Sequence, residues 1–119
     1  MSLLVALALI PAMPICPPGP RDDCVVDGDS PWWGGERIRL ADIDAPEMQG
    51  RCASATQLAL RARNRLAELL GNGFTITRIG TDRYDRTLAV VTVGGLSVGD
   101  LLVGEGLART WSGRREPWC

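Results

Sequence analysis

Residues 32–47 read WWGGERIRLADIDAPE, and this stretch decides the fold class. Two tryptophans, the pair Gly34-Gly35 and an alternating run over 36–43 are typical of a strand, a two-residue hairpin turn and a second strand. Within the second strand, isoleucine and leucine alternate with Arg37 and Arg39. Successive side chains of a strand point to opposite faces, so one face is predicted to be buried and the other to present arginine.

On either side of this stretch, short apolar runs alternate with turn residues, and one long segment has helical periodicity instead. Small and apolar residues recur at three- and four-residue steps over 54–70, which predicts an amphipathic core helix that Gly71 or Gly73 would end. A second, shorter helix is predicted over 98–105, with Gly106 past its end. The remaining strands are predicted over 24–26, 74–79 and 87–93, with a polar loop over 80–86.

The order of these elements is three strands, a helix, two strands and a helix, which predicts an α+β, mainly β fold. A parallel sheet built from βαβ units is disfavoured, because the first three strands are joined by turns too short for crossovers. The expected architecture is a five-stranded OB-fold barrel with two helices, a Greek-key fold that often binds oligonucleotides. A chain of 119 residues allows one compact domain, predicted over 23–119 after a Pro-rich linker at 16–22.

The beginning of the chain and its cysteines both suggest export. The apolar run LLVALALI at 3–10 resembles the core of a signal peptide, predicted over 1–15, with a buried N-terminal strand as the alternative. Four cysteines without C-x-x-C spacing favour disulfides over a zinc site, whereas free thiols would fit a chain kept in a reducing cytosol. Three pairings are possible, of which we favour Cys16 with Cys24, closing a Pro-rich turn, and Cys52 with Cys119. The expected location is periplasmic or secreted, with no membrane contact after processing.

The composition excludes several catalytic mechanisms. The chain has no His, which rules out Ser-His and Cys-His pairs, His-ligated zinc and an imidazole base. All 13 basic residues are Arg, a usage that a GC-rich genome also produces but whose forked guanidinium suits phosphate. The net charge of −1 gives no general basic field, so contact with a polyanion must be local. A hydrolase of this composition must use carboxylates.

Polar side chains gather at three places where predicted elements end, which is where sites usually form. Carboxylates with no Cys or His among them would supply hard oxygen ligands, which suit Ca²⁺ or Mg²⁺ rather than a transition metal. Guanidinium groups would neutralise a phosphate, and Glu47 is the one acid or base that the set offers. Solvated turns without function would show the same charges. The three groups are Asp27 with Asp29; Arg39 with Asp44 and Glu47; and Arg83 with Arg86.

Three strings closely resemble the signature segments of the staphylococcal (thermonuclease-like) nuclease family, in the same order and spacing. They are DGDS at 27–30, IRLADIDAPE at 38–47 and DRYDR at 82–86. A fourth string, GLAR at 106–109, is similar to the segment that follows the second helix of that family. The resemblance covers about residues 25–111, and the joint occurrence of three motifs is specific although each one alone is not. The third helix of the family has no counterpart in the predicted elements.

The resemblance implies a calcium site and a base. Asp29 and Asp44 match the carboxylate ligands of one Ca²⁺, with the backbone carbonyl of Ala45 beside them. Glu47 matches the glutamate that activates or orients the attacking water. The implied function is a calcium-dependent endonuclease.

The resemblance also implies how the substrate is held. Arg39 and Arg86 match the two arginines that grip the scissile phosphate, and Tyr84 matches a tyrosine that contacts the nucleotide, with Arg83 next to it in the substrate-binding group. The family hydrolyses phosphodiester bonds of DNA and RNA to 3′-phosphorylated products. We therefore expect a monomer that acts on nucleic acid, with single strands preferred.

Three positions depart from the family pattern, of which Ser30 in place of threonine is a conservative change. Ala45 replaces the usual threonine, which is a mild change where only the carbonyl binds metal. Asp85 stands where the family commonly has glycine, so it carries a strain cost in a left-handed conformation and adds negative charge near a phosphate site. The alternative function is a catalytically weakened or inactive OB-fold module that binds nucleic acid or protein. Such a module would be expected to lose the arginines or the glutamate, and both are present here.

Overall fold

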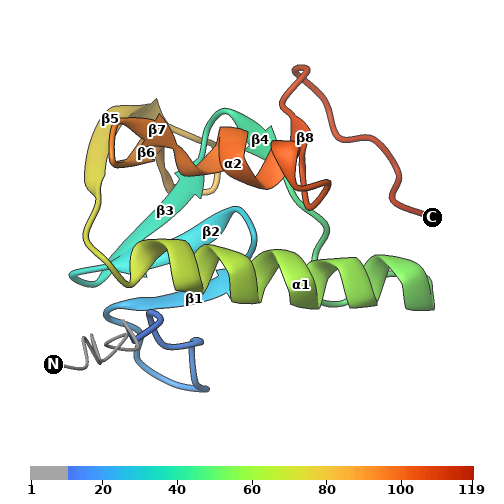
Figure 1. Cartoon of the computed structure of the whole chain (residues 1–119), viewed down its shortest axis with the longest axis horizontal. Coiled ribbons are helices and arrows are strands. Elements are labelled where there is room, and N and C mark those ends of the chain that lie inside the picture. The colour runs from blue at the N-terminus through green and yellow to red at the C-terminus, as the bar shows by residue number, and fades with distance from the viewer. Residues whose placement is uncertain (1–10) are drawn as a thin grey trace, which may run out of the picture.

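The structure, a computed structural model, describes residues 11–119 as eight strands and two helices (Figure 1). The predicted signal-peptide core at 3–10 lies outside the described residues. Within 11–119, neither helix is both long and apolar enough to cross a membrane. The elements are β1 (Cys24–Asp27), β2 (Ser30–Trp33), β3 (Glu36–Leu40), β4 (Ile43–Asp44), α1 (Ala53–Leu70), β5 (Thr75–Thr81), β6 (Thr87–Val93), β7 (Leu96–Ser97), α2 (Val98–Gly104) and β8 (Arg109–Thr110).

The main sheet has the strand order β1-β2-β3-β6-β5, with β7 paired to β6. The turn between β2 and β3 is the predicted two-residue hairpin, and its residues Gly34 and Gly35 have φ of 58° and 76°, the left-handed values that such a turn requires. The fold class is confirmed as α+β and mainly β with two helices. In the described residues the ladder remains open, because β5 does not pair back to β1.

β3 and β6 pair in parallel, which the short turns of the first strands did not predict. The connection between them contains α1 and β5, and that length allows the crossover that a parallel pair needs. The register sets Ile38 opposite Thr87 and Arg39 opposite Leu88. This pairing therefore brings the β3 arginine beside the start of β6 and the loop that precedes it.

The strand predicted over 36–43 is split in the structure. β3 ends at Leu40, and after a turn the two residues of β4 pair instead with β8, Ile43 with Thr110 and Asp44 with Arg109. In the turn, the Asp42 carboxylate accepts a hydrogen bond of 2.5 Å from the hydroxyl of Ser97. The break turns the chain out of the main sheet just before the predicted metal ligands.

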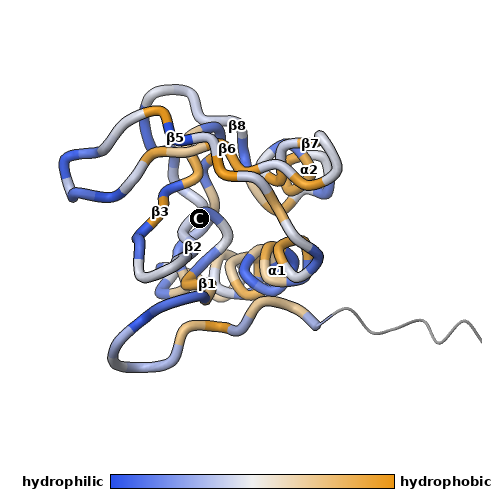
Figure 2. Tube along the Cα trace, turned by 90° about the vertical axis from the view of Figure 1, so that its left-hand side faces the viewer, coloured by the Kyte–Doolittle hydropathy of each residue, from blue (hydrophilic) through white to orange (hydrophobic). Residues whose placement is uncertain are grey.

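α1 begins one residue before the predicted helix and covers β1, while α2 contacts β6, β8 and β4 (Figure 1). The alanines of α1 at 55, 59 and 62 are buried, so the backbone of this helix approaches the sheet closely. Figure 2 shows the orange, apolar stretches of β6 and of the helices set against blue, polar loops. The largest fully buried side chains of the core are Ile38, Leu40, Ile43, Leu66, Leu102, Val25, Val91 and Val98.

Residues 11–16 pack against the body of the domain. Met13 is buried in the core, and its N–H donates to the carbonyl of Ala67 (2.9 Å). The N–H of Cys16 donates to the carbonyl of Val25 (3.0 Å), and a disulfide joins Cys16 to Cys24 as predicted. The packed unit thus begins before residue 23, while the leader boundary at residue 15 stays a prediction.

Glu36 links the start of β3 to two other strands, and this contact makes stability depend on pH. Its carboxylate accepts hydrogen bonds from Arg78 on β5 (2.9 Å) and Thr87 on β6 (2.7 Å), and these contacts lower its pKa to about 2. A carboxyl whose pKa is lower in the folded than in the unfolded chain stabilises the fold above its unfolded pKa, and this stabilisation is lost as the pH falls through the folded pKa.

We therefore expect Glu36→Gln to lower the urea midpoint of unfolding at pH 7 and to have a much smaller effect near pH 2, where about half of the Glu36 carboxyls are protonated in the folded chain. The shift at pH 7 should be small, because the side chains of Glu36 and Arg78 are 32% and 51% exposed and solvent screens their pair. Glu68→Gln, an exposed change on α1, is the control. An equal shift at both pH values would contradict the ionic origin of the effect.

Candidate functional site

A cavity of about 630 Å³ opens between the turn after β1, the strand β3, the loop between β5 and β6, and the chain after β8. It brings together residues from all three polar groups that the sequence singled out. Asp44 and Ala45 do not line the cavity but contact residues that do. Asp44 pairs with Arg115, and the N–H of Ala45 donates to Asp29. The predicted residues that line the cavity are Asp27, Asp29, Arg39, Glu47, Arg83, Tyr84 and Arg86.

The turn at 27–29 is held close to α1 by the absence of a side chain at Gly28. A Cβ there would lie 2.7 Å from the Cβ of Ala62 and 3.0 Å from that of Ala45. Asp29 then reaches across to the residue after β4, because its Oδ2 accepts a hydrogen bond of 2.9 Å from the N–H of Ala45. Helix, turn and β4 are therefore tied together directly behind the cavity.

Arg39 is a buried cation with fixed neighbours. Only 8% of the residue is exposed, and its guanidinium lies 3.6 Å from the carboxylate of Asp29. It also donates to the carbonyls of Leu40 and of Ile43, the latter at 2.8 Å, and lies 5.5 Å from the centre of the Trp111 ring. A buried charge is costly unless it is paired and hydrogen-bonded, and these contacts meet that need while Arg39 still lines the cavity.

The carboxylates of the site are crowded in a buried place. Burial, and then the charge of Asp29, raise the pKa of Asp27 to about 7. Burial also raises the pKa of Asp44, and the guanidiniums of Arg115 and Arg39 oppose that rise. Asp29 and Asp44 are each only 3% exposed. The buried carboxylates of the site therefore lie close together, with the guanidiniums of Arg39 and Arg115 opposing their charge.

The donor set fits a hard cation with several ligands from outside the side chains. Within residues 11–119, no three acidic or cysteine side chains gather closely enough to complete a metal site by themselves. Asp29, Asp44 and the carbonyl of Ala45 would supply oxygen ligands only, and water would have to complete the shell. Ca²⁺ tolerates such mixed and irregular oxygen coordination better than Mg²⁺ does.

Glu47 is exposed at the mouth of the cavity and is paired with an arginine that the sequence analysis missed. Its Oε1 accepts a hydrogen bond from Nη1 of Arg115, and Nη2 of Arg115 lies 3.4 Å from Oδ1 of Asp44. Arg115 lies in the segment after β8, where no periodicity or motif distinguishes it from Arg114 beside it. Only the path of the chain after β8 places Arg115 beside the carboxylates of Glu47 and Asp44.

The loop before β6 is organised around Asp82. Its Oδ1 accepts hydrogen bonds from the N–H groups of Tyr84 and Arg86, both at 2.9 Å, and its Oδ2 accepts from Nε of Arg86 at 2.7 Å. Burial alone would raise the pKa of Asp82, but these hydrogen bonds hold that pKa below its ordinary value. The guanidiniums of Arg83 and Arg86 lie 4.8 Å and 5.5 Å from the centre of the Tyr84 ring. Asp82 thus fixes two of the three predicted contact residues of this loop, Tyr84 and Arg86.

Asp85, in the same loop, has φ of 62°, the one positive value of a non-glycine residue in the described part of the chain. This is the left-handed conformation that the comparison with glycine led us to expect. The residue is exposed and directly precedes Arg86.

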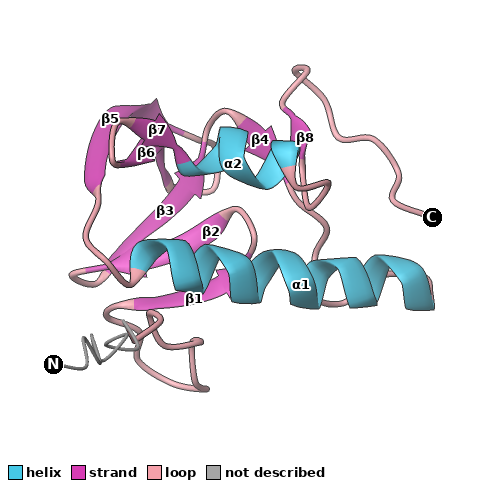
Figure 3. Cartoon of the chain, in the orientation of Figure 1, coloured by secondary structure: helices cyan, strands magenta, loops and turns pink. Residues whose placement is uncertain are grey.

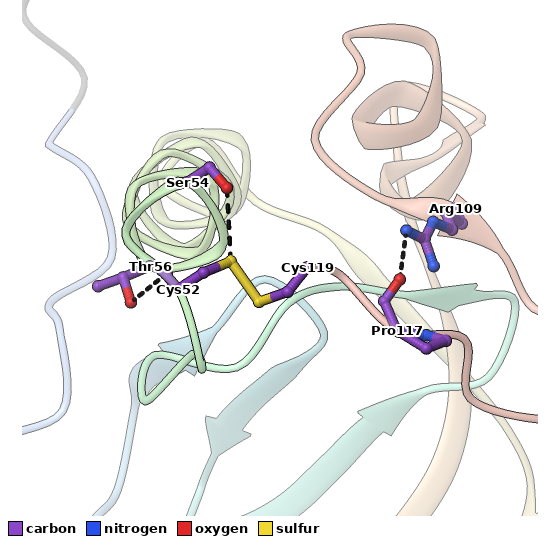
Figure 4. The surroundings of a disulfide bond; sticks show 6 residues. All are labelled: Cys52, Ser54, Thr56, Arg109, Pro117 and Cys119. Atoms are coloured by element: carbon purple, nitrogen blue, oxygen red, sulfur yellow. Dashed lines mark hydrogen bonds between the residues drawn. A yellow bond between two sulfur atoms is a disulfide. The ribbon is translucent and has the colours of Figure 1, made fainter.

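The segment 111–119, which we call the tail, follows β8 as a loop (Figure 3). A disulfide joins its last residue, Cys119, to Cys52 at the start of α1, which is the predicted pairing (Figure 4). Arg109 of β8 donates to the carbonyl of Pro117 at 2.9 Å, and its guanidinium lies 3.6 Å from the centre of the Trp118 ring. The last three residues of the tail are therefore held in place.

Comparison with known proteins gives two matches. The family model described as staphylococcal nuclease homologue matches residues 37–117. A micrococcal nuclease of Shigella flexneri is 48% identical over 56 residues, which are 46% of this chain and 29% of that protein. The matched part thus spans less than a third of that relative.

Proposed function

This chain belongs to the staphylococcal nuclease homologue family, and we propose that it hydrolyses phosphodiester bonds of DNA or RNA with one bound Ca²⁺. The observation that carries the proposal is the convergence of Asp29, Arg39, Glu47 and Arg86 on one cavity. Two guanidiniums, a carboxylate exposed to water and buried carboxylates behind them are the groups that hydrolysis of a phosphodiester needs.

In this proposal Asp29, Asp44 and the carbonyl of Ala45 hold the ion. When bound, the ion supplies positive charge for the phosphate oxygens and lowers the pKa of water. The proposal is supported by the burial of both carboxylates and by their all-oxygen chemistry.

The remaining steps belong to residues of the cavity. Glu47 takes the proton of the attacking water, because it is the exposed carboxylate at the mouth of the cavity. Arg39 and Arg86 hold the phosphate while negative charge grows on its oxygens. The oxygen of the water bonds to phosphorus and the bond from phosphorus to the 5′ oxygen breaks. The 5′ oxygen takes a proton from solvent, which leaves a 3′-phosphate and a 5′-hydroxyl. Tyr84, which is 57% exposed, offers a ring to an unpaired base, and this favours single strands.

The proposed setting is the periplasm or the medium, where the chain acts as a monomer. Two disulfides support an oxidising compartment, and the apolar run at 3–10 supports export.

The first test is metal dependence. With oxidised protein and denatured DNA, we expect Ca²⁺ to support cleavage and a chelator to lower the rate at least about a hundredfold, because the phosphate and the attacking water then lose the charge that the ion supplies. Gel analysis of the products would measure cleavage. Calorimetric titration of Ca²⁺ into wild type and into Asp44→Asn would measure binding of the ion. Cleavage that ignores the chelator would reject the ion. Salt-sensitive binding of DNA without any cleavage would favour the binding module.

A second test concerns Asp85. We expect Asp85→Gly to raise kcat/KM by about threefold, because one negative charge leaves the neighbourhood of the phosphate and the left-handed backbone is free of strain. Asp85→Asn, which removes the charge but keeps the side-chain size, separates the two causes. Unchanged rates in both variants would show that the departure from glycine is neutral.

A further inference from the structure

A second cavity, of about 390 Å³, lies beside the first. Glu47 and Arg115 line both cavities, so the two adjoin at this pair of side chains. A bound chain that passes the first cavity would meet the second as it continues past Glu47.

The second cavity places two guanidiniums beside apolar surface, and the carboxylates of Glu47 and Glu116 also line it. Arg51, which is exposed, and Arg115 supply two guanidiniums. Trp118 on the tail supplies the main apolar wall, because Pro46 and Ala55, which also line the cavity, are almost fully buried. Guanidiniums beside an aromatic ring are the chemistry that binds a phosphate and a base of a single strand.

The tail that forms one wall of this cavity is held in place before any ligand arrives. The Cys52–Cys119 disulfide fixes its end, and Arg109 holds the carbonyl of Pro117 (Figure 4). The Arg109 guanidinium also lies over the ring of Trp118. A wall that is already ordered does not lose conformational entropy on binding, which favours affinity.

We propose that the second cavity is a subsite for the nucleotide next to the scissile phosphate, with Arg51 on its phosphate and Trp118 against its base. Arg115 binds the phosphate between the two cavities. Its present partners, Glu47 and Asp44, are single carboxylate oxygens, whereas a phosphate offers the guanidinium a bidentate partner. The inference rests on the proposed nuclease function, since a strand cut internally continues on both sides of the cleaved bond. The cavity volume lies in the range of sites for small ligands.

The test compares a ligand that reaches both cavities with one that does not. The first is a fluorescent single strand of about eight nucleotides, whose affinity is measured by anisotropy in chelator at one salt concentration. The second is a nucleoside p-nitrophenyl phosphodiester, which carries a nucleoside on one side of the phosphate only. Its cleavage is followed in Ca²⁺.

We expect Arg51→Gln, Arg115→Gln and Trp118→Ala each to weaken binding of the single strand about tenfold. Arg61→Gln removes an exposed arginine of α1 that lines neither cavity, and it should leave the affinity unchanged. Because Trp118→Ala also loosens the tail, Arg51→Gln is the independent variant on the opposite wall, and Trp118→Phe should restore most of the affinity.

Replacing both Cys52 and Cys119 by alanine should weaken binding of the single strand to a similar extent, with the Cys16–Cys24 disulfide left intact. Unchanged affinity in both Arg51→Gln and Trp118→Ala would overturn the subsite. Tighter binding in Arg115→Gln or in the double alanine variant would also overturn it, since the tail would then block the groove. If wild type cleaves neither the ester nor the strand, the proposed nuclease function fails. A loss of affinity in Arg51→Gln and Trp118→Ala but not in Arg61→Gln would still support binding of a nucleotide in the second cavity.

Discussion

Glu47→Gln is expected to lower kcat on denatured DNA by about 10³-fold, with little change in KM. Glutamine keeps the size of the side chain and its contact with Arg115, but it cannot take a proton from water. Glu47 is exposed at the cavity mouth, so the loss of its charge leaves no buried group unpaired. Initial rates at saturating Ca²⁺ over a range of DNA concentrations would separate kcat from KM.

Glu68→Gln is the matched control, because Glu68 is an exposed glutamate of α1 that lines neither cavity. Its kcat should equal that of wild type. If Glu47→Gln cut DNA at the wild-type rate, another group would have to take the proton, and the proposed role of Glu47 would be wrong. A large rise in KM at constant kcat would instead assign Glu47 to binding.

Arg39→Ala is expected to lower kcat/KM by about 10³-fold and the free energy of unfolding by about 3 kcal/mol. The catalytic loss follows from removing one of the two guanidiniums aimed at the phosphate. The loss of stability follows because Asp29, 3% exposed, loses the cation that lies 3.6 Å from it. Urea unfolding and steady-state rates on denatured DNA would measure the two effects independently.

Arg37→Ala provides the control for this change, because Arg37 lies two residues away on β3 and is exposed. It should leave both quantities close to wild type. Arg39→Lys keeps the charge beside Asp29 but loses the fork, so it should recover most of the stability and little of the activity. Full activity in Arg39→Lys would contradict a bidentate role in phosphate binding.

Local patterns predicted those parts of the fold that local forces determine. The helix over 54–70 was predicted because its apolar stripe is long and regular, and the hairpin was predicted because Gly34 and Gly35 allow its left-handed turn. The pairing of β4 with β8 was missed, because each strand has two residues and no periodicity can identify it. The parallel pairing of β3 with β6 depends on a distant crossover, which no short segment encodes.

The candidate site divides in the same way. The residues at 27–30, 38–47 and 82–86 were found because each string carries several polar residues at fixed spacing, and the fold brings all three strings to one cavity. Arg115 was not found, since its position depends on a disulfide to Cys52 and on the path of the chain after β8. The pKa of Asp27 could not be predicted either, because it results from burial by elements distant in the sequence.

The parallel pairing of β3 and β6 also determines when, during synthesis, Arg39 and Arg86 can come together. Arg39 precedes α1, whereas Arg86 is translated only after α1 and β5, immediately before β6. Until β6 has left the ribosome and paired with β3, a nascent chain therefore cannot place Arg86 beside Arg39. Ribosome-bound fragments that stop before this point have no assembled site. Under the proposed function, the two phosphate-binding arginines can therefore meet only late in synthesis.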